Sequence, residues 1–365
     1  MKVLFITRKH PPAVGGMENQ SYNLLRSVPV DKRSVVLRRS QRHLPWFLPY
    51  ALARSTAIAR REDLDCIHLG DALLAPLGAV LRRTLGLPVA VTVHGLDVIW
   101  RPALYQATVS PALRAMDRVV CTSQASLQAC LSRGVPGERC CVIPCGIDAA
   151  EFESDADREQ ARREVAGLLE GEPGNRPLLV TAGRLVPRKG HGWFLEHVLP
   201  LLKSEAVYVI AGRGPQQEAI RWTAARLGLA DQVRLLGEIE RTSLLRLLRA
   251  ADIFVMPNVP TEGDIEGFGI VGLEAAASGC VVVATRVDGI PSAIVDGQNG
   301  WLVEPLNAGQ MADRIGAILE DPAQARAFAA RARSFTLRNY SWESIGQSYL
   351  REFERMLAEA GRRQR

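Results

Sequence analysis

The chain has 365 residues, of which 47% are hydrophobic and 23% are charged. This composition excludes a disordered protein, and the length exceeds one hydrophobic core, so we expect two folded domains rather than a peptide hormone or a single small binding module. Residues 1–150 carry 19 basic and 10 acidic side chains, a net charge of +9, whereas the remaining residues carry 26 and 29, a net charge of −3.

Short apolar runs, separated by helical stretches, organise the first half of the chain. The first of them, VLFI, is followed by charged residues and is too short for a signal peptide or a membrane span, so we expect a cytoplasmic protein. Short runs of nearly continuous apolar character are typical of central strands in a parallel sheet covered by helices. We expect such strands at residues 3–7, 34–39, 66–69, 89–93, 118–122 and 141–144.

Most of the excess positive charge lies between the first and third of these runs. Arg38, Arg39 and Arg42 precede a segment that contains Trp46 and Tyr50. Arginines beside aromatic residues are typical of a helix that lies on an anionic membrane surface, and also of a helix whose apolar side packs on the sheet while its arginines face water. Both interpretations stay open. The chain contains no nucleic-acid-binding motif, so we expect no nucleic acid partner.

The second half begins after a polar and then glycine- and proline-rich segment, residues 153–177. Further strands are expected at residues 178–183, 207–212, 233–237, 252–257, 281–285 and 300–304. The pattern predicts an α/β protein with two Rossmann-like, doubly wound domains, residues 1–165 and 175–335, and a C-terminal segment, residues 336–365, whose helix Ser341 caps. Because such sheets bind ligands at the carboxyl ends of their strands, we expect the active site in a cleft between the two domains.

We expect no metal site and no disulfide. The seven cysteines form an odd set without a C-x-x-C pair, which favours reduced thiols packed in the cores. Two D-x-D sequences, residues 63–65 and 155–157, could in principle hold a divalent ion. The first precedes a strand and the second lies in the polar linker, so neither is placed at the carboxyl end of a strand.

The segment with the most candidate binding residues is TEGDIEGFGIVGLEAAASG, which follows the strand expected at 252–257. Gly267 and Gly269 allow a tight turn, and a helix that begins near Phe268 would direct its free N–H groups and its positive dipole end at an anion such as a diphosphate. Glu266 precedes this helix and can accept hydrogen bonds from sugar hydroxyls, although a glutamate here also compensates the dipole. Glu274, about two turns inside, lies among small residues and needs a partner if it is buried.

Two more clusters follow strands of the second series. In TAGRLVPRKG, the guanidinium group of Arg184 can contact two phosphate oxygens, and the ammonium group of Lys189 supplies a compact positive charge. In AGRGP, a glycine turn contains Gly212, but Gln217 stands where a dinucleotide-binding loop has its third glycine. Together the three clusters indicate one pyrophosphate pocket.

The sequence resembles the retaining glycosyltransferases of family 4, which have the GT-B architecture. The resemblance spans nearly the whole chain and rests on PPAVGGMEN (11–19), VTVHGLD (91–97), VIPCGID (142–148), AGRLVPRKG (182–190) and EGFGIVGLE (266–274). It implies transfer of a hexose from a nucleotide-diphosphate sugar, used as co-substrate without a cofactor, to a glycan or lipid-linked acceptor. It also implies a C-terminal helix that crosses back onto the N-terminal domain, and a role in cell-surface glycan or polysaccharide synthesis. If the basic N-terminal face binds anionic lipid, we expect the protein at the inner face of the membrane.

By this resemblance, Arg184 and Lys189 neutralise the leaving diphosphate, Glu266 positions the hexose, Glu274 holds the ribose and His94 approaches the transferred sugar. The donor-binding residues it implies are Gly15, Gly16, Gly183, Gly212, Gly267, Phe268, Gly269, Ile270, Val271 and Glu274.

Three other classes remain as alternatives. A sugar-nucleotide epimerase of the same fold usually carries a different set of carboxylates and histidines. A regulatory homologue that binds nucleotide sugar with weak catalysis is disfavoured because Arg184, Lys189, Glu266 and Glu274 are all present. An NAD-dependent oxidoreductase is disfavoured because no segment completes the dinucleotide glycine set.

Overall fold

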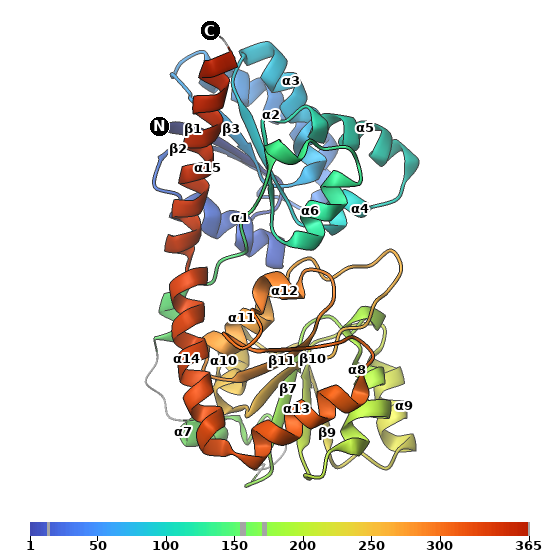
Figure 1. The fold of residues 1–365 in the computed structure, drawn as a ribbon. Helices are drawn as coiled ribbons and strands as arrows, with labels where there is room; N and C mark the ends of the chain where they lie inside the picture. Colours follow the sequence, from blue (N-terminus) through green and yellow to red (C-terminus); the bar gives the residue numbers. More distant parts are fainter. Residues whose placement is uncertain (13–14, 154–157, 170–173, 364–365) are drawn as a thin grey trace. The chain divides into compact units, whose positions relative to one another are not determined.

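The computed structural model describes residues 1–12, 15–153, 158–169 and 174–363. Contacts divide the chain into two compact units, one made of residues 1–146 and 340–365 and the other of residues 147–339 (Figure 1). The division therefore falls before residue 147 and not between 165 and 175. The reason is that α7 (Arg158–Val165) packs along α10 (Arg241–Ala250), and Arg162 Nη2 lies 3.1 Å from Asp252 Oδ2.

The first unit is built on a six-stranded parallel sheet with the order β2-β1-β3-β4-β5-β6. Its strands are β1 (Lys2–Thr7), β2 (Asp31–Val36), β3 (Cys66–Leu69), β4 (Val89–Val93), β5 (Arg118–Cys121) and β6 (Cys140–Val142). Its α-helices are α1 (Gly16–Ser27), α2 (Leu44–Ala59), α3 (Ala75–Leu85), α4 (Leu96–Ile99), α5 (Ala103–Arg114), α6 (Gln124–Leu131) and α15 (Trp342–Arg363). Short 3₁₀ turns are η1 (Gln41–His43), η2 (Ala72–Leu74) and η3 (Gly137–Arg139).

The second unit has a six-stranded parallel sheet with the order β12-β11-β10-β7-β8-β9. Its strands are β7 (Leu178–Ala182), β8 (Val207–Ala211), β9 (Val233–Gly237), β10 (Ile253–Met256), β11 (Val281–Thr285) and β12 (Trp301–Val303). Besides α7 and α10, its α-helices are α8 (His191–Trp193), α9 (Gln217–Arg226), α11 (Ile270–Ala277), α12 (Ile290–Ala293), α13 (Ala308–Glu320) and α14 (Pro322–Tyr340). Short helical turns are η4 (Ala149–Phe152), η5 (Pro187–Lys189), η6 (Phe194–Val198) and η7 (Leu199–Leu201).

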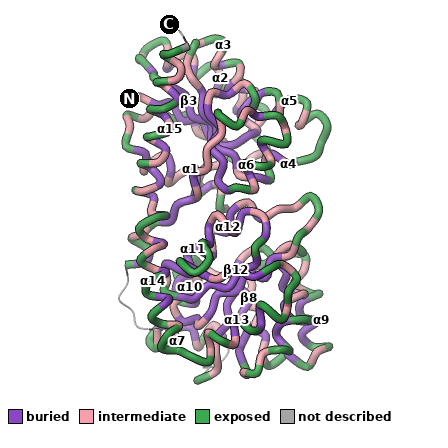
Figure 2. Tube along the Cα trace, in the orientation of Figure 1, coloured by how far each residue is buried: buried purple, intermediate pink, exposed green. Residues whose placement is uncertain are grey.

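The strands expected from apolar runs are all present. The inner strands of both sheets are buried, whereas β2, β6 and β9 are partly exposed (Figure 2). The exception in position is β2, which begins three residues earlier than expected and includes Asp31, Lys32 and Arg33. As the edge strand it is partly exposed, so its polar first half is tolerated. All seven cysteines are free, and five of them are buried.

The helix α15 packs on the sheet of the first unit. Tyr349 and Phe353 are fully buried together with Phe5 of β1, and the Tyr349 hydroxyl lies 2.9 Å from Thr92 Oγ1. Ser341 Oγ accepts a hydrogen bond from the Ser344 N–H at 3.2 Å, so the expected cap is confirmed. The C-terminal helix therefore contributes to the core of the N-terminal unit.

Candidate active site

The turns after β7 and β8 touch at the carboxyl edge of the second sheet. Gly183 and Gly212 both have a φ of 139°, and a Cβ atom at Gly212 would lie 1.9 Å from the Gly183 carbonyl oxygen. The contact continues where the Leu185 N–H donates to the Arg213 carbonyl oxygen at 2.9 Å. Two of the three predicted clusters are thus adjacent, and only glycine permits this approach of the two backbones.

The third cluster meets the first at the carboxylate of Glu266. Lys189 Nζ lies 2.6 Å from Glu266 Oε2, and Asn258 Nδ2 donates to the same oxygen at 3.0 Å. Arg188 forms a further ion pair with this oxygen and also contacts Asp264 Oδ1 at 3.1 Å. Glu266 is only 8% exposed, so this carboxylate is held in the protein by three donors.

The surroundings of Glu266 keep it ionised. Burial alone raises the pKa of the carboxyl, but the charges of Lys189 and Arg188 and the hydrogen bond from Asn258 outweigh it and hold the pKa below its usual value. The main chain is also fixed, because the Glu266 N–H donates to Asp288 Oδ2 at 3.0 Å. A charged acceptor therefore stands beside two cations, an arrangement that can bind both hydroxyl and phosphate groups.

The helix α11 begins at Ile270, two residues later than expected. Gly269 precedes it with a φ of 89°, and no side chain caps its first N–H groups. Its positive end is therefore available to an anion. Phe268 is 5% exposed and anchors the turn. Gly289 allows a close approach to this turn, because a Cβ atom there would lie 2.1 Å from the Gly267 carbonyl oxygen.

Glu274 lies about one turn inside α11, not two, and it is buried. The partner that a buried carboxylate needs is Arg241 of α10, whose Nη1 lies 2.8 Å from Glu274 Oε1. Arg241 also pairs with Glu151 of η4. Burial raises the pKa of Glu274, and the attraction of Arg241 offsets this only in part. The carboxyl is thus tied to two other elements of the same unit.

Three members of this group could not be identified from the sequence, and one predicted residue, Arg184, makes no ion pair with the group. Arg188 was passed over although it adjoins Lys189, and the only available signal was its position in the same turn. Asn258 and Arg241 come from other segments and carried no signal. Arg184 is exposed, and among the described residues its side chain has no ion-pair partner.

In the first unit, the loops after β1, β3 and β4 form a separate polar group. His94 Nε2 lies 3.1 Å from the Gly70 carbonyl oxygen, and Asp97 accepts the N–H groups of His94 at 2.8 Å and Ala72 at 3.0 Å. Asp97, in the first turn of α4, therefore joins two loops. His94 is half-buried at the end of β4.

The N-terminus of α1 lies in the same loop region of this unit. Gly15 and Gly16 open α1, no side chain caps it, and a Cβ atom at Gly16 would meet no atom within 4 Å. Glu18 is buried and pairs with Lys9 Nζ at 2.9 Å, so it has a structural partner besides the helix dipole. The Glu18 carboxylate also lies beside Gly15, at the N-terminus of α1.

Of the two D-x-D sequences, the one at residues 63–65 lies within the described residues. Asp65 Oδ2 accepts the N–H of Lys2 at 2.6 Å, and residues 155–157 lie outside the described residues. No group of three or more potential ligands gathers in the part of the chain that the structure describes. Among the same residues, no helix has the length and apolar character needed to cross a membrane.

Comparison with known proteins places this geometry in a family. A model described as Glycosyltransferase Family 4 matches residues 2–151, and one described as Glycosyl transferases group 1 matches residues 169–335. The GDP-mannose-dependent alpha-(1-6)-phosphatidylinositol monomannoside mannosyltransferase of Mycolicibacterium smegmatis is 32% identical over 309 residues, which are 82% of this chain and 78% of that protein. The monoacylated-substrate counterpart of Corynebacterium glutamicum is 25% identical over 375 residues, covering 95% and 96%.

Solved structures agree on the architecture. The crystal structure of HepE from Anabaena in complex with UDP matches with a TM-score of 0.77 at 20% identity, covering 97% of this chain and 100% of that one. Two parallel sheets together with this match show the GT-B fold, which confirms the predicted fold class. The chain belongs to the group 1 glycosyltransferases of the family 4 type, as its resemblance indicated.

Proposed function

We propose that the enzyme transfers a hexose from a nucleotide-diphosphate sugar to an acceptor hydroxyl with retention of the anomeric configuration, in the synthesis of a cell-surface glycan. The observation that carries this proposal is the group of Lys189, Arg188 and Asn258 around the ionised carboxylate of Glu266, one turn ahead of the uncapped N-terminus of α11. This group combines cations for a diphosphate with a fixed acceptor for sugar hydroxyls.

The donor is best supported as a GDP-hexose, with GDP-mannose as the first candidate. The relatives in Mycolicibacterium smegmatis and Corynebacterium glutamicum are both named as GDP-mannose-dependent mannosyltransferases, and they align over most of this chain. Those names also mention phosphatidylinositol mannosides as acceptors, which supports a glycolipid acceptor here. A UDP-sugar donor is the alternative, since HepE binds UDP on the same fold.

The chemistry follows from the charges. As the sugar–phosphate bond breaks, negative charge grows on the diphosphate, and Lys189, Arg188, Arg184 and the first N–H groups of α11 stabilise it. Lys189 exchanges part of its contact with Glu266 for the phosphate, which frees Glu266 to accept from the hexose hydroxyls. The leaving diphosphate accepts the acceptor proton on the same face of the sugar, so no enzymic nucleophile and no metal ion is needed.

Retention is tested by the stereochemistry of the first product. GDP-α-mannose and octyl α-mannoside are incubated with the enzyme, and the new anomeric signal is followed by proton NMR with and without EDTA. We expect an α-linked product at an undiminished rate in EDTA. A β-linked product would contradict retention, loss of transfer in EDTA would contradict the metal-free mechanism, and donor binding without transfer would favour the regulatory alternative.

We also propose that the first unit binds the anionic inner face of the membrane through α2 and the segment before it. On α2, Phe47 packs into the core, whereas Trp46 is 78% and Tyr50 57% exposed. Arg39 and Arg42, just before α2, are exposed as well. One side of α2 therefore packs into the core, and the other side carries aromatic rings near positively charged side chains. This arrangement suits contact with anionic lipid headgroups.

Membrane binding is tested by co-sedimentation with vesicles of phosphatidylglycerol and phosphatidylcholine. Reversing the charge of Arg38, Arg39 and Arg42 should abolish binding to the anionic vesicles, and Trp46→Ser should weaken it. The control reverses Arg331 and Arg338, exposed on α14 of the second unit. Equal binding of the first variant and the wild type would rule out this surface.

A further inference from the structure

A second cavity lies in the C-terminal unit, at the sheet edge opposite the donor site. It has a volume of about 460 Å³ and is bordered by Pro177, Asp252 and Val281, which stand at the amino ends of β7, β10 and β11. The Glu266 constellation follows the carboxyl ends of the same sheet. The cavity is thus separate from the proposed donor pocket, and its volume suits a ligand of the size of a sugar phosphate.

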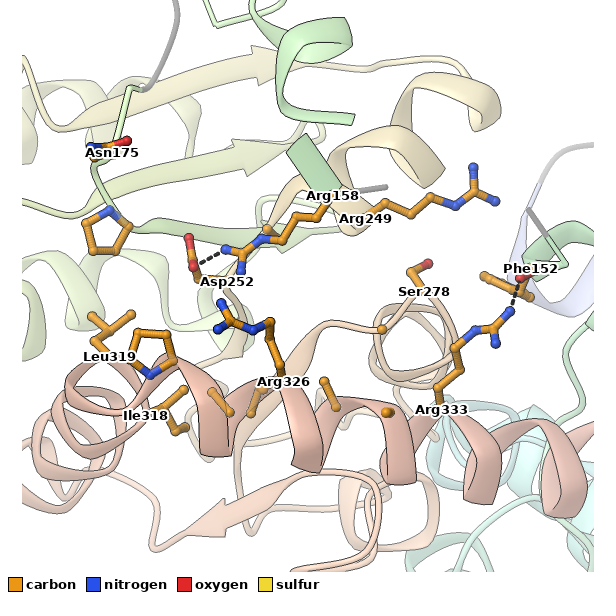
Figure 3. A pocket seen from close by; sticks show the side chains of 18 residues that line it. Phe152, Arg158, Asn175, Arg249, Asp252, Ser278, Ile318, Leu319, Arg326 and Arg333 are labelled. Atoms are coloured by element: carbon orange, nitrogen blue, oxygen red, sulfur yellow. Dashed lines mark hydrogen bonds and ion pairs between the residues drawn. The ribbon is translucent and has the colours of Figure 1, made fainter. Parts of the chain in front are cut away.

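Four arginines line this cavity, and they come from three helices. Arg158 belongs to α7, Arg249 to α10, and Arg326 and Arg333 to α14. Figure 3 shows Arg326 rising from α14 toward Arg158, with Asp252 beside them. Among the described residues that line the cavity, Asp252 is the only acidic one.

Within the described residues, the one lining carboxylate does not balance the four arginines of the cavity. Asp252 pairs with Arg158, but it also pairs with Arg162 outside the cavity, 3.1 Å away. Arg249 donates to the Glu151 carbonyl oxygen at 3.1 Å, and Arg333 donates to the Ala277 carbonyl oxygen at 3.1 Å, so both are held by neutral groups.

Arg326 is exposed at the cavity and makes no hydrogen bond or ion pair to any described residue. Several guanidinium groups that line one hollow repel one another, and an anion relieves this repulsion.

The shape of the cavity also leaves room for a ligand. Ala325, Ala329 and Ala330 of α14 line it on the side of Arg326 and Arg333, so small side chains keep the space open between the arginines. Ser278, half-buried at the end of α11, adds a hydroxyl to the lining. The lining therefore combines forked cations with a small apolar wall, which matches a phosphorylated small molecule with a carbon skeleton.

We propose that this cavity is a second ligand site, specific for a small phosphorylated anion with at least two negative charges and distinct from the donor pocket. Arg326 and Arg249 bind the phosphate oxygens, and the alanine face of α14 contacts the rest of the ligand. The site lies wholly within the second unit and needs no contribution from the first.

The test measures binding of inorganic pyrophosphate by calorimetry at constant ionic strength, in the full chain that carries Lys189→Ala to weaken the donor pocket. We expect saturable binding there, weakened at least tenfold by adding Arg249→Glu with Arg326→Glu. The matched control is Arg331→Glu with Arg338→Glu, which makes the same charge change on α14 outside the cavity lining and should leave the affinity unchanged. Thermal unfolding without ligand shows whether each variant is folded.

A second variant keeps every charge and fills the space instead. Ala330→Leu, at an exposed position of the cavity wall, should also weaken pyrophosphate binding, by at least fivefold. Pyrophosphate binding that is absent in Lys189→Ala would overturn the proposal, because the anion would then occupy only the donor pocket. Binding that falls equally in Arg331→Glu with Arg338→Glu would overturn it too, because the anion would then respond to overall charge. Undiminished binding in both Arg249→Glu with Arg326→Glu and Ala330→Leu would overturn it as well.

Discussion

At the scale of single residues, the site depends on how Lys189 and Arg188 share the carboxylate of Glu266. All three side chains are largely buried, and each neutralises part of the charge of the others. Removal of one member leaves a charge without a counterion in a place with little water, which costs more than the pair contributes on its own. The three side chains that we propose bind the donor thus also stabilise the fold of the ligand-free enzyme.

We expect Glu266→Gln to lower the stability by about 3 kcal/mol at pH 7, because Lys189 and Arg188 lose their buried partner. The folded-state pKa of Glu266 lies below its ordinary value, so the contribution of its charge is present above that value and is lost as the pH falls through the folded pKa. The difference in unfolding temperature between variant and wild type should therefore shrink on acidification below about pH 4.5. A difference that is constant with pH would show that the ionised carboxylate does not stabilise this turn.

At the scale of elements, α10 connects the turn η4 with α11 through one arginine. Arg241 pairs with Glu151 of η4 and with the buried Glu274 of α11, so the orientation of Glu274 depends on two other segments. Burial raises the pKa of Glu274, and Arg241 is the one cation that opposes this shift. The connection fixes the carboxylate that we propose accepts hydrogen bonds from the donor.

Arg241→Ala should therefore destabilise the protein in a pH-dependent way. Without Arg241 the folded-state pKa of Glu274 rises further, and a group with a raised pKa contributes stability at low pH that is lost as the pH rises through the folded pKa. We expect the loss of stability to grow between pH 5 and pH 8 and to reach about 3 kcal/mol. Thermal unfolding across this range measures it.

The control for this effect is the double variant Arg241→Ala with Glu274→Gln. It has no buried charge at this position, so it should be more stable than Arg241→Ala alone at pH 8 and should show no extra pH dependence. If the double variant were as unstable as the single one, the loss would come from packing of the Arg241 side chain and not from the charge of Glu274.

The helix α15 contributes buried aromatic side chains to the core of the first unit. Phe353 is fully buried beside Tyr349 and Phe5 in the first unit. We expect Phe353→Ala to cost about 3–5 kcal/mol in unfolding free energy because it leaves a cavity under the sheet. Glu354→Ala, at an exposed position one residue on, should stay within about 0.5 kcal/mol of the wild type. Similar unfolding curves for both variants would mean that α15 is not part of the core.

At the scale of the whole molecule, the sequence was sufficient to predict both sheets and their family. Strands such as 66–69 and 89–93 were predicted with their observed bounds, because burial on both faces leaves a continuous apolar run that few other structures explain. The edge strand β2 was misplaced, because an edge needs fewer apolar residues. The unit boundary was placed late, because the packing of α7 on α10 is a tertiary contact without a local signal.

The candidate site was also predictable from the sequence only in part. Gly212 and Gly269 could be predicted, because each has a positive φ and leaves little room for a Cβ atom, so that no other residue fits there. Arg241 and Asn258 could not be predicted, because an arginine on a helix or an asparagine after a strand has many roles, and only the fold brings them to Glu274 and Glu266. The arginine-lined cavity was not predicted for the same reason.

The central claim is that Lys189 and its neighbours form the pocket for a nucleotide-diphosphate sugar. The most direct test is isothermal titration of GDP-mannose and UDP-glucose, without divalent metal, into the wild type, Lys189→Ala and Lys203→Ala, the last a control at an exposed lysine of the same unit. We predict that GDP-mannose binds the wild type and Lys203→Ala equally, and Lys189→Ala at least tenfold more weakly, since a hydrogen bond to a charged group contributes about 1.5–3 kcal/mol. Equal affinity in all three proteins, or no binding of either nucleotide sugar to the wild type, would contradict the account.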